Sequence, residues 1–330
     1  MTFKKLTSIK DLQMMADVIR EDIISSLVAA KSGHSAGPLG MADIFTVLYF
    51  NILNHNPEAP QWEGRDYLVL SNGHICPVLY ATMANAGYFP KKELLTLRKL
   101  GTRLQGHPHR ESLPGLETTS GPLGSGLSQA CGMAYGLRVD KKKNKVFCLM
   151  SDGEHDEGNT WEAVLFAAKY KLDNVIAILD RNYIQIDGNT EDIMPLDSIE
   201  EKYKAFNWNV ITIDGNDMTH IMKTLEKAKS NKGKPLMIIA KTMPGKGVSF
   251  MEGKYEWHGK PPKANEAEVA LRELHEKESH ERGDWYVKHL KLKPVHAVKQ
   301  SKKAKVVPSS KPAAKKKPII KSKSKKGKKK

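Results

Sequence analysis

The stretch KVFCLMSDGEHDEGNTWEAVLFAAKYKLDNVIAILDRNYIQIDG, from Lys145 to Gly188, decides the fold class of this chain. It begins with an apolar run, Val146 to Met150, whose length is typical of a buried strand, and continues into a helical pattern from about residue 159 to 170. A second apolar run follows at residues 175–179. Strand, helix and strand in this order predict two parallel strands joined by a crossover helix.

Polar residues follow both strands at the point where each ends. Asp152 and Gly153 follow the first strand, and Asn182 follows the second, 30 residues after Asp152. Because the carboxyl ends of neighbouring parallel strands face one crevice, we expect Asp152 and Asn182 to meet there. A carboxylate and an amide oxygen suit Mg²⁺, with Ca²⁺ or Mn²⁺ as alternatives, and a glycine lets a backbone N–H approach a phosphate. The alternative is that both segments are ordinary turns after strands.

The same alternation of apolar runs and helical patterns extends over most of the chain. It predicts an α/β fold, a doubly wound and mostly parallel sheet with helices on both faces. The small residues before position 41 are expected to form a flexible connection. The expected strands are residues 67–70, 208–213 and 235–240, and the expected helices are residues 9–31, 41–53, 77–86, 91–99, 127–137, 218–230 and 264–284.

Composition favours a cytoplasmic protein. The three cysteines, Cys76, Cys131 and Cys148, are widely spaced in apolar or small-residue surroundings, which predicts buried, reduced thiols rather than a disulfide or metal site. The sequence MTFKKLTSIKDL at the start has no apolar core of signal-peptide length, and no run of 18 apolar residues occurs, so we expect no transmembrane segment.

The net charge of +16 is concentrated at one end of the chain. Residues 296–330 contain 15 lysines and no acidic residue, so the preceding residues are nearly neutral. We therefore expect one domain over residues 1–290 and a disordered, lysine-rich tail over residues 291–330. A solvated extension is one interpretation of this tail. Binding of nucleic acid or another acidic surface is the other.

Four histidines stand in loops where a functional role is conceivable. His34 follows Gly33 after the first helix, and His74 follows a glycine at the end of an expected strand. His107 lies in a long loop, residues 101–126, whose dense glycines predict a backbone held close to a ligand or to another chain. His258 occurs in the segment YEWHGKPP.

Six motifs in one order give the chain a family resemblance. They are SGH at 32, LSNGH at 70, GHP at 106, GLETTSGPLGSG at 115, the SDG-to-Asn182 stretch and His258. Over about residues 10–285 the sequence resembles the N-terminal, diphosphate-binding half of transketolases, which are thiamine diphosphate enzymes. Ser151 stands where the family motif has a glycine, a departure expected to alter the turn more than the ligands.

The resemblance implies a role for each matching residue. Asp152, Asn182 and the backbone carbonyl of Ile184 would hold Mg²⁺, and His34, His107 and His258 would face the ketose donor as catalytic residues. Glu157 matches an acidic residue near the contact between subunits, with a less defined role. The remaining cofactor contacts would be Gly153, His74 and His258 to the diphosphate, Ile186 to the thiazolium ring, and the backbone of Gly121 and Leu123 to the aminopyrimidine.

The sequence is most similar to the N-terminal subunits of split transketolases. This similarity implies transfer of a two-carbon unit from a ketose phosphate to an aldose phosphate, in an α₂β₂ complex with a separate C-terminal transketolase subunit. That second chain would contribute the glutamate that acts on the aminopyrimidine and the arginines that bind the sugar phosphate. Three alternatives remain: the α-subunit of a 2-oxo acid dehydrogenase, a pseudo-enzyme with the same fold, and a polyanion-binding protein acting through its tail.

Overall fold

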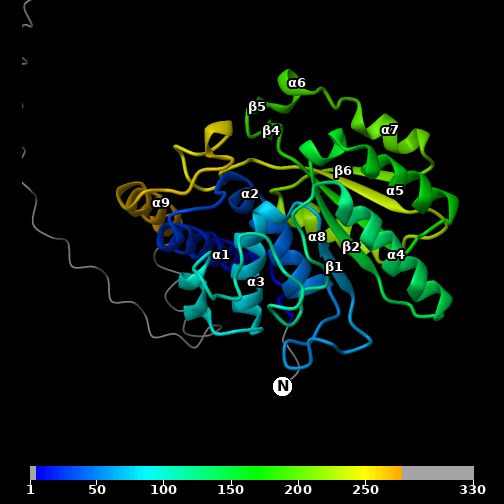
Figure 1. Cartoon of the computed structure of the whole chain (residues 1–330), viewed down its shortest axis with the longest axis horizontal. Helices are drawn as coiled ribbons and strands as arrows, with labels where there is room; N and C mark the ends of the chain where they lie inside the picture. The colour runs from blue at the N-terminus through cyan, green and yellow to red at the C-terminus, as the bar shows by residue number, and fades with distance from the viewer. Residues whose placement is uncertain (1–4, 277–330) are drawn as a thin grey trace, which may run out of the picture.

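The computed structural model describes residues 5–276 of the chain. Its centre is a five-stranded sheet (Figure 1). All strands are parallel, and their order is β1-β2-β3-β7-β6. The predicted lysine-rich tail, the domain boundary at residue 290 and the end of the last expected helix lie outside the described residues. The strands are β1 (Tyr67–Leu70), β2 (Val146–Ser151), β3 (Val175–Arg181), β6 (Asn209–Asp214) and β7 (Leu236–Lys241).

The sheet separates two hydrophobic cores because alternate strand residues point to opposite faces. On β2, Phe147 and Leu149 belong to one core, whereas Val146 and Cys148 belong to the other. All residues of β2 and β3 are buried, which explains why these strands appear in the sequence as continuous apolar runs rather than alternating ones. The predicted doubly wound α/β fold is confirmed.

Helices cover both faces of the sheet, as Figure 1 shows. The larger core contains a group of helices dominated by α1, whose apolar residues recur every three or four positions and are buried throughout. This group is α1 (Ile9–Ala30), α2 (Ala36–Val47), α3 (Cys76–Ala86), α8 (Met218–Ala228) and α9 (Ala264–Glu276). The smaller core is covered by α4 (Ser125–Val139), α5 (Gly158–Lys169) and α7 (Ile199–Ala205).

One helix begins earlier than its sequence predicts. The expectation of a flexible connection before residue 41 is wrong, because α2 starts at Ala36 and all its residues are buried. Gly40 permits this packing: a Cβ at that position would lie 2.8 Å from the carbonyl oxygen of Met243. The helix continues as one π-helical turn, Leu48–Ile52. The expected helix at 91–99 is a short 3₁₀ segment, Lys91–Thr96.

Short elements complete the described chain. The 3₁₀ segments Gly73–Ile75 and Gly153–Asp156 directly follow the carboxyl ends of β1 and β2, and a third, Tyr255–Trp257, precedes His258. After β3 the chain forms a small antiparallel pair, β4 (Ile184–Gln185) with β5 (Gly188–Asn189), and then α6 (Thr190–Ile193). The three cysteines are buried and unpaired, as predicted. Within residues 5–276, no helix is both long and apolar enough to cross a membrane.

Candidate functional site

A cavity of about 300 Å³ lies at the carboxyl edge of the sheet, where most of the predicted site residues meet. Its walls come from loops that are far apart in the sequence but follow β1, β2, β3 and the first helix, as expected for a parallel sheet. We call it the histidine cavity. Its lining residues are His34, His74, His107, Gly121, Leu123, Ser151, Gly153, Asn182, Ile184, Gln185, Ile186 and His258.

Three of the four lining histidines form a compact triangle. The ring centroids of His34 and His74 are 5.1 Å apart, those of His74 and His258 are 5.1 Å apart, and those of His34 and His258 are 5.6 Å apart. His107 reaches the same wall from the long loop. A Cβ added to Gly73 would lie 3.2 Å from the His107 ring and 2.6 Å from Ser120, so only glycine lets these loops approach so closely.

All four imidazoles are held in their neutral form at neutral pH. Burial lowers the pKa of His34 to about 4, and the positive charge of Arg98, together with that of His258 and His107 in their protonated forms, adds to this effect. Burial likewise lowers the pKa of His74 well below its usual value and lowers those of His107 and His258. A neutral imidazole has one N–H donor and one acceptor nitrogen. The cavity is therefore suited to hydrogen-bonding hydroxyls and phosphate oxygens rather than to providing fixed positive charge.

Asp152 and Asn182 meet at the carboxyl ends of β2 and β3, which pair directly. Asp152 is 1% exposed, and its Oδ2 accepts hydrogen bonds from Arg181 Nη1 (2.9 Å), the Tyr183 N–H (2.8 Å) and Thr190 Oγ1 (3.1 Å). Its Oδ1 is buried without a hydrogen-bond partner. The Asn182 side chain is oriented by Asp180, whose Oδ2 accepts from Asn182 Nδ2 at 2.8 Å. Its Oδ1 accepts from the Ile184 N–H at 3.1 Å and keeps a second lone pair.

This donor set fits a hard divalent cation. One carboxylate oxygen without a partner and one amide oxygen with a second lone pair are the kind of incomplete oxygen set that Mg²⁺ completes with phosphate oxygens and water. In residues 5–276 no group of three or more His, Cys, Asp or Glu side chains is placed to hold a metal ion. Burial raises the pKa of Asp152 to about 6 despite Arg181 beside it, and a bound cation would favour the carboxylate.

The cavity also fits an organic diphosphate. A Cβ at Gly121 would meet no atom within 4 Å, and one at Gly153 would meet only Gln185, at 3.6 Å. Close protein packing therefore does not require glycine at these two positions, and both border the open space of the cavity. The buried Nδ1 of His34 and the buried Oγ of Ser120 next to Gly121 have no hydrogen-bond partner within residues 5–276. Ile186, predicted to contact the thiazolium ring, lines the cavity and is 65% exposed.

Glu157 is one of two predicted site residues that do not line the histidine cavity. It is exposed and precedes α5, and its Cβ lies near Gly124. Asp152 lies directly behind the wall, between the lining residues Ser151 and Gly153. The other predicted site residues all line the cavity.

Two arginines at the site were missed by sequence reasoning. Arg181 ends β3 and is 1% exposed; besides Asp152, it binds Asp197 at 3.0 Å and Glu191. Arg98 donates to Ser32 Oγ and to the Gly106 carbonyl, both at 3.2 Å, and so links the loops that carry His34 and His107. Neither arginine has a local sequence signal, because the groups that it binds come from other loops.

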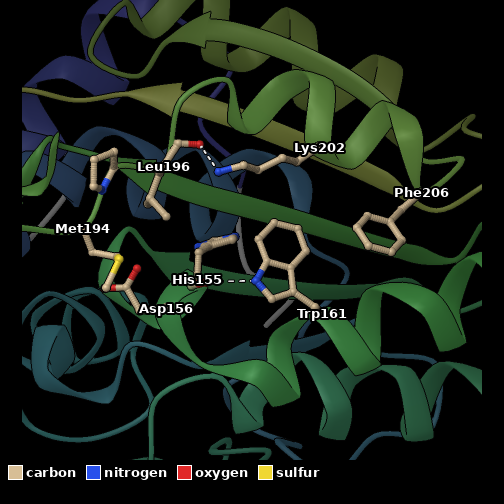
Figure 2. A pocket seen from close by; sticks show the side chains of 8 residues that line it. His155, Asp156, Trp161, Met194, Leu196, Lys202 and Phe206 are labelled. Atoms are coloured by element: carbon tan, nitrogen blue, oxygen red, sulfur yellow. Dashed lines mark hydrogen bonds between the residues drawn. The ribbon is translucent and has the colours of Figure 1, made fainter.

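A second cavity, of about 340 Å³, is lined by His155 and Asp156, in the turn that follows Asp152, and by residues between 161 and 206 (Figure 2). Trp161, Phe206 and Met194 form much of its wall, and the Lys202 amine donates to the Leu196 carbonyl at 2.7 Å. None of its lining residues has a buried side-chain nitrogen or oxygen without a partner, whereas His34 and Asp152 do. Of these two cavities, only the histidine cavity is lined by such a group, the Nδ1 of His34, which makes it the better candidate site.

Comparisons with known proteins agree with this geometry. Residues 12–281 match the family of the transketolase, thiamine diphosphate binding domain. A 6-deoxy-6-sulfo-D-fructose transketolase subunit of Clostridium sp. (strain MSTE9) is 43% identical over 75% of this chain and 90% of its own length. An apulose-4-phosphate transketolase subunit of Phocaeicola vulgatus is 39% identical over 82% of this chain and 95% of its own length.

Single-chain transketolases are also similar, but they are longer. The human enzyme is 39% identical over 82% of this chain and 43% of its own length. The crystal structure of the Campylobacter jejuni transketolase superimposes with a TM-score of 0.76 at 34% identity, covering 82% of this chain and 43% of the other. The chain thus spans less than half of these enzymes. The fold, the histidine cavity and these matches together show that the chain belongs to the transketolase family and corresponds to its thiamine diphosphate-binding domain.

Proposed function

We propose that this chain is the N-terminal subunit of a two-subunit transketolase. The carrying observation is the histidine cavity, where neutral imidazoles, an unpartnered carboxylate oxygen and open glycine positions converge on one edge of the sheet. Two relatives that are themselves named transketolase subunits support a two-subunit enzyme. The match to this chain covers 90% of the length of one and 95% of the length of the other.

The proposed metal is Mg²⁺, with Ca²⁺ or Mn²⁺ as alternatives. Asp152 Oδ1, Asn182 Oδ1 and the Ile184 carbonyl would hold it, while Arg181 keeps the second Asp152 oxygen occupied and so aims the first at the cation. The Gly153 N–H, His74 and His258 would bind the diphosphate. Because these groups are neutral, the cation would provide the charge that a diphosphate requires.

When bound, thiamine diphosphate supplies the carbon nucleophile that adds to a ketose carbonyl. The protein's part is orientation and electrostatics. His34, His107 and His258 would hold the donor hydroxyls and donate hydrogen bonds to the carbonyl oxygen as it gains charge, which is typically the largest catalytic contribution. Backbone at Gly121 and Leu123 would orient the aminopyrimidine, and Ile186 would pack against the thiazolium ring.

A second chain is needed for complete chemistry in this proposal. We propose an α₂β₂ complex with a C-terminal transketolase subunit that covers the open side of the histidine cavity and contributes the sugar-phosphate contacts. The test is a panel of ketose and aldose phosphates assayed with this full chain, with a candidate partner, and with both. Two-carbon transfer should require both chains. Transfer by this chain alone at a normal rate would contradict the two-subunit proposal.

The lysine-rich segment at residues 296–330 supports a separate proposal, that it binds polyanions. Its 15 lysines without an acidic residue are the observation that favours this function. Binding to RNA or DNA should weaken steeply as salt rises and should disappear when the chain is cut at residue 295, with transketolase activity retained. Loss of activity on truncation would instead indicate a role in assembly of the complex.

A further inference from the structure

A buried carboxyl group beside the histidine cavity has no part in the chemistry proposed above. Glu154 lies in the turn after Asp152 and is 0% exposed. Its Oε1 accepts a hydrogen bond from Ser71 Oγ at 2.5 Å, and its Oε2 accepts from the Ser151 N–H at 3.2 Å and from Ser151 Oγ at 3.4 Å. A buried carboxylate must be stabilised by such donors, and here they come from the ends of two different strands.

The same network reaches a third segment through Ser71. The Gly126 N–H, at the start of α4, donates to Ser71 Oγ at 3.2 Å, while the Ser71 hydroxyl donates to Glu154. The three groups therefore form one directed chain of hydrogen bonds. A Cβ at Gly126 would lie 2.4 Å from Ser71 Cβ, so glycine is required for α4 to approach β1 this closely.

Each segment that Glu154 joins also contributes walls to the histidine cavity. The residues after Ser71 lead to His74, the turn at Ser151 leads to Gly153, and the residues before Gly126 include Gly121 and Leu123. The contact also gives the hydroxyl of Ser151, which stands where the family motif has glycine, a hydrogen-bond partner in the carboxyl group of Glu154.

We propose that Glu154 is a positioning residue for cofactor binding, whose carboxylate ties the ends of β1 and β2 and the start of α4 at the spacing that the cavity walls require. This inference rests on the proposed thiamine diphosphate function of the cavity. Glu154 itself is fully buried and does not line the histidine cavity. Its effect should therefore appear in how much thiamine diphosphate the complex needs, more than in the rate once the site is filled.

The variant Glu154→Gln tests this role with little change in volume. A glutamine has one acceptor oxygen, so its NH₂ group must face either Ser71 or Ser151, and at least one existing donor loses its acceptor. Asp66→Asn is the matched control. Asp66 is also buried, at 8% exposure, and accepts hydrogen bonds from the backbone N–H groups of Asn54, at 3.0 Å, and Lys145, at 2.9 Å. It differs from Glu154 in its place, because it precedes the amino end of β1, whereas the histidine cavity lies at the carboxyl ends of the strands.

The first measurement uses the full chain alone and follows amide hydrogen exchange. In Glu154→Gln, at least one of the amides of Ser151 and Gly126 should exchange about tenfold faster, the factor expected when one buried hydrogen bond is lost. In Asp66→Asn those two amides should keep their wild-type exchange, while at least one of the amides of Asn54 and Lys145 loses protection, because asparagine keeps a single acceptor oxygen. Unchanged exchange at Ser151 and Gly126 in Glu154→Gln would overturn the proposed tie.

The second measurement uses the complex with the C-terminal chain. Glu154→Gln should raise the thiamine diphosphate concentration for half-maximal turnover about tenfold, with a smaller fall in kcat at saturation. Glu154→Ala should raise it further. If Asp66→Asn raised the thiamine diphosphate concentration for half-maximal turnover equally, the effect would come from a general loss of stability, and the proposal would be overturned. If the wild-type complex transferred no two-carbon unit, the proposed function would fail, and hydrogen exchange would still decide whether Glu154 joins the three segments.

Discussion

Replacing Asp152 with asparagine separates the two tasks that the structure assigns to its two oxygens. Oδ2 binds three donors inside the protein, and Oδ1 has no partner. An asparagine can present its single oxygen to Arg181, Tyr183 and Thr190, which turns its NH₂ group toward the proposed metal position. The variant should therefore fold but place two donors where a cation requires an acceptor.

The cost to folding can be estimated from the contacts. The variant loses the charge of one partner of Arg181, but Arg181 keeps its ion pairs with Asp197 and Glu191. The loss should be near that of a charge-assisted hydrogen bond, about 1.5–3 kcal/mol, and below the about 3–5 kcal/mol for a buried ion left without any partner. Affinity for Mg²⁺ should fall more than about 100-fold, beyond the range for residues that only support a metal ligand.

Two assays on the same preparations distinguish these effects. Urea unfolding of the full chain without metal gives the folding cost, and Mg²⁺ titration of the complex at fixed thiamine diphosphate gives the metal affinity. Asp66→Asn serves as the control that loses hydrogen bonds of a buried carboxyl group far from the cavity. A variant that folds and binds Mg²⁺ with wild-type affinity would refute the assignment of Asp152 as a metal ligand.

Three further predictions concern the histidine cavity. His107→Ala should lower kcat by about 10²–10³-fold, the effect of removing one donor to developing charge, and leave thiamine diphosphate affinity within a few-fold; a pure affinity loss would contradict its donor-facing role. Arg98→Met should move the acid limb of the activity profile to higher pH, because burial and the Arg98 charge both lower the pKa values of His34 and His107, and Arg98→Lys should restore it; identical limbs in all three proteins would be inconsistent with this. The pKa of His34 is about 4 in the folded protein and 6.5 in the unfolded chain. As pH falls from 6.5 to 4, the unfolded state therefore binds a proton first, and the protein loses stability over that window. The urea midpoint of His34→Gln should decline less steeply there than that of wild type.

Much of the fold was predictable because its strands carry strong local signals. Residues 146–150 and 175–179 are fully buried on both faces, so selection for apolar side chains acts on every position. The meeting of Asp152 and Asn182 followed from the parallel arrangement alone, since β2 and β3 are neighbours in register.

What escaped prediction depends on partners distant in sequence. Helix α2 looked flexible because its Gly40 and other small residues weaken local helix propensity, yet they allow close packing against Met243. Arg181 looked like part of a turn, whereas its ion-pair partners Glu191 and Asp197 lie in the segment after β5. The pair β4–β5 has two residues per strand, too few for any periodic pattern.

The position of β7 between β3 and β6 determines the order in which the strands can pair as the chain is synthesised. β3 pairs with β2 on one side and with β7 on the other, and β6 pairs in the sheet through β7, which follows it in the chain. During synthesis, β6 therefore emerges before the strand that joins it to the sheet, and one edge of β3 stays open until residues 236–241 leave the ribosome. His258 follows later still, so the histidine triangle closes only after the whole sheet is complete. During synthesis the unpaired edge of β3 therefore stays exposed until β7 has emerged, and the histidine cavity can form only after that.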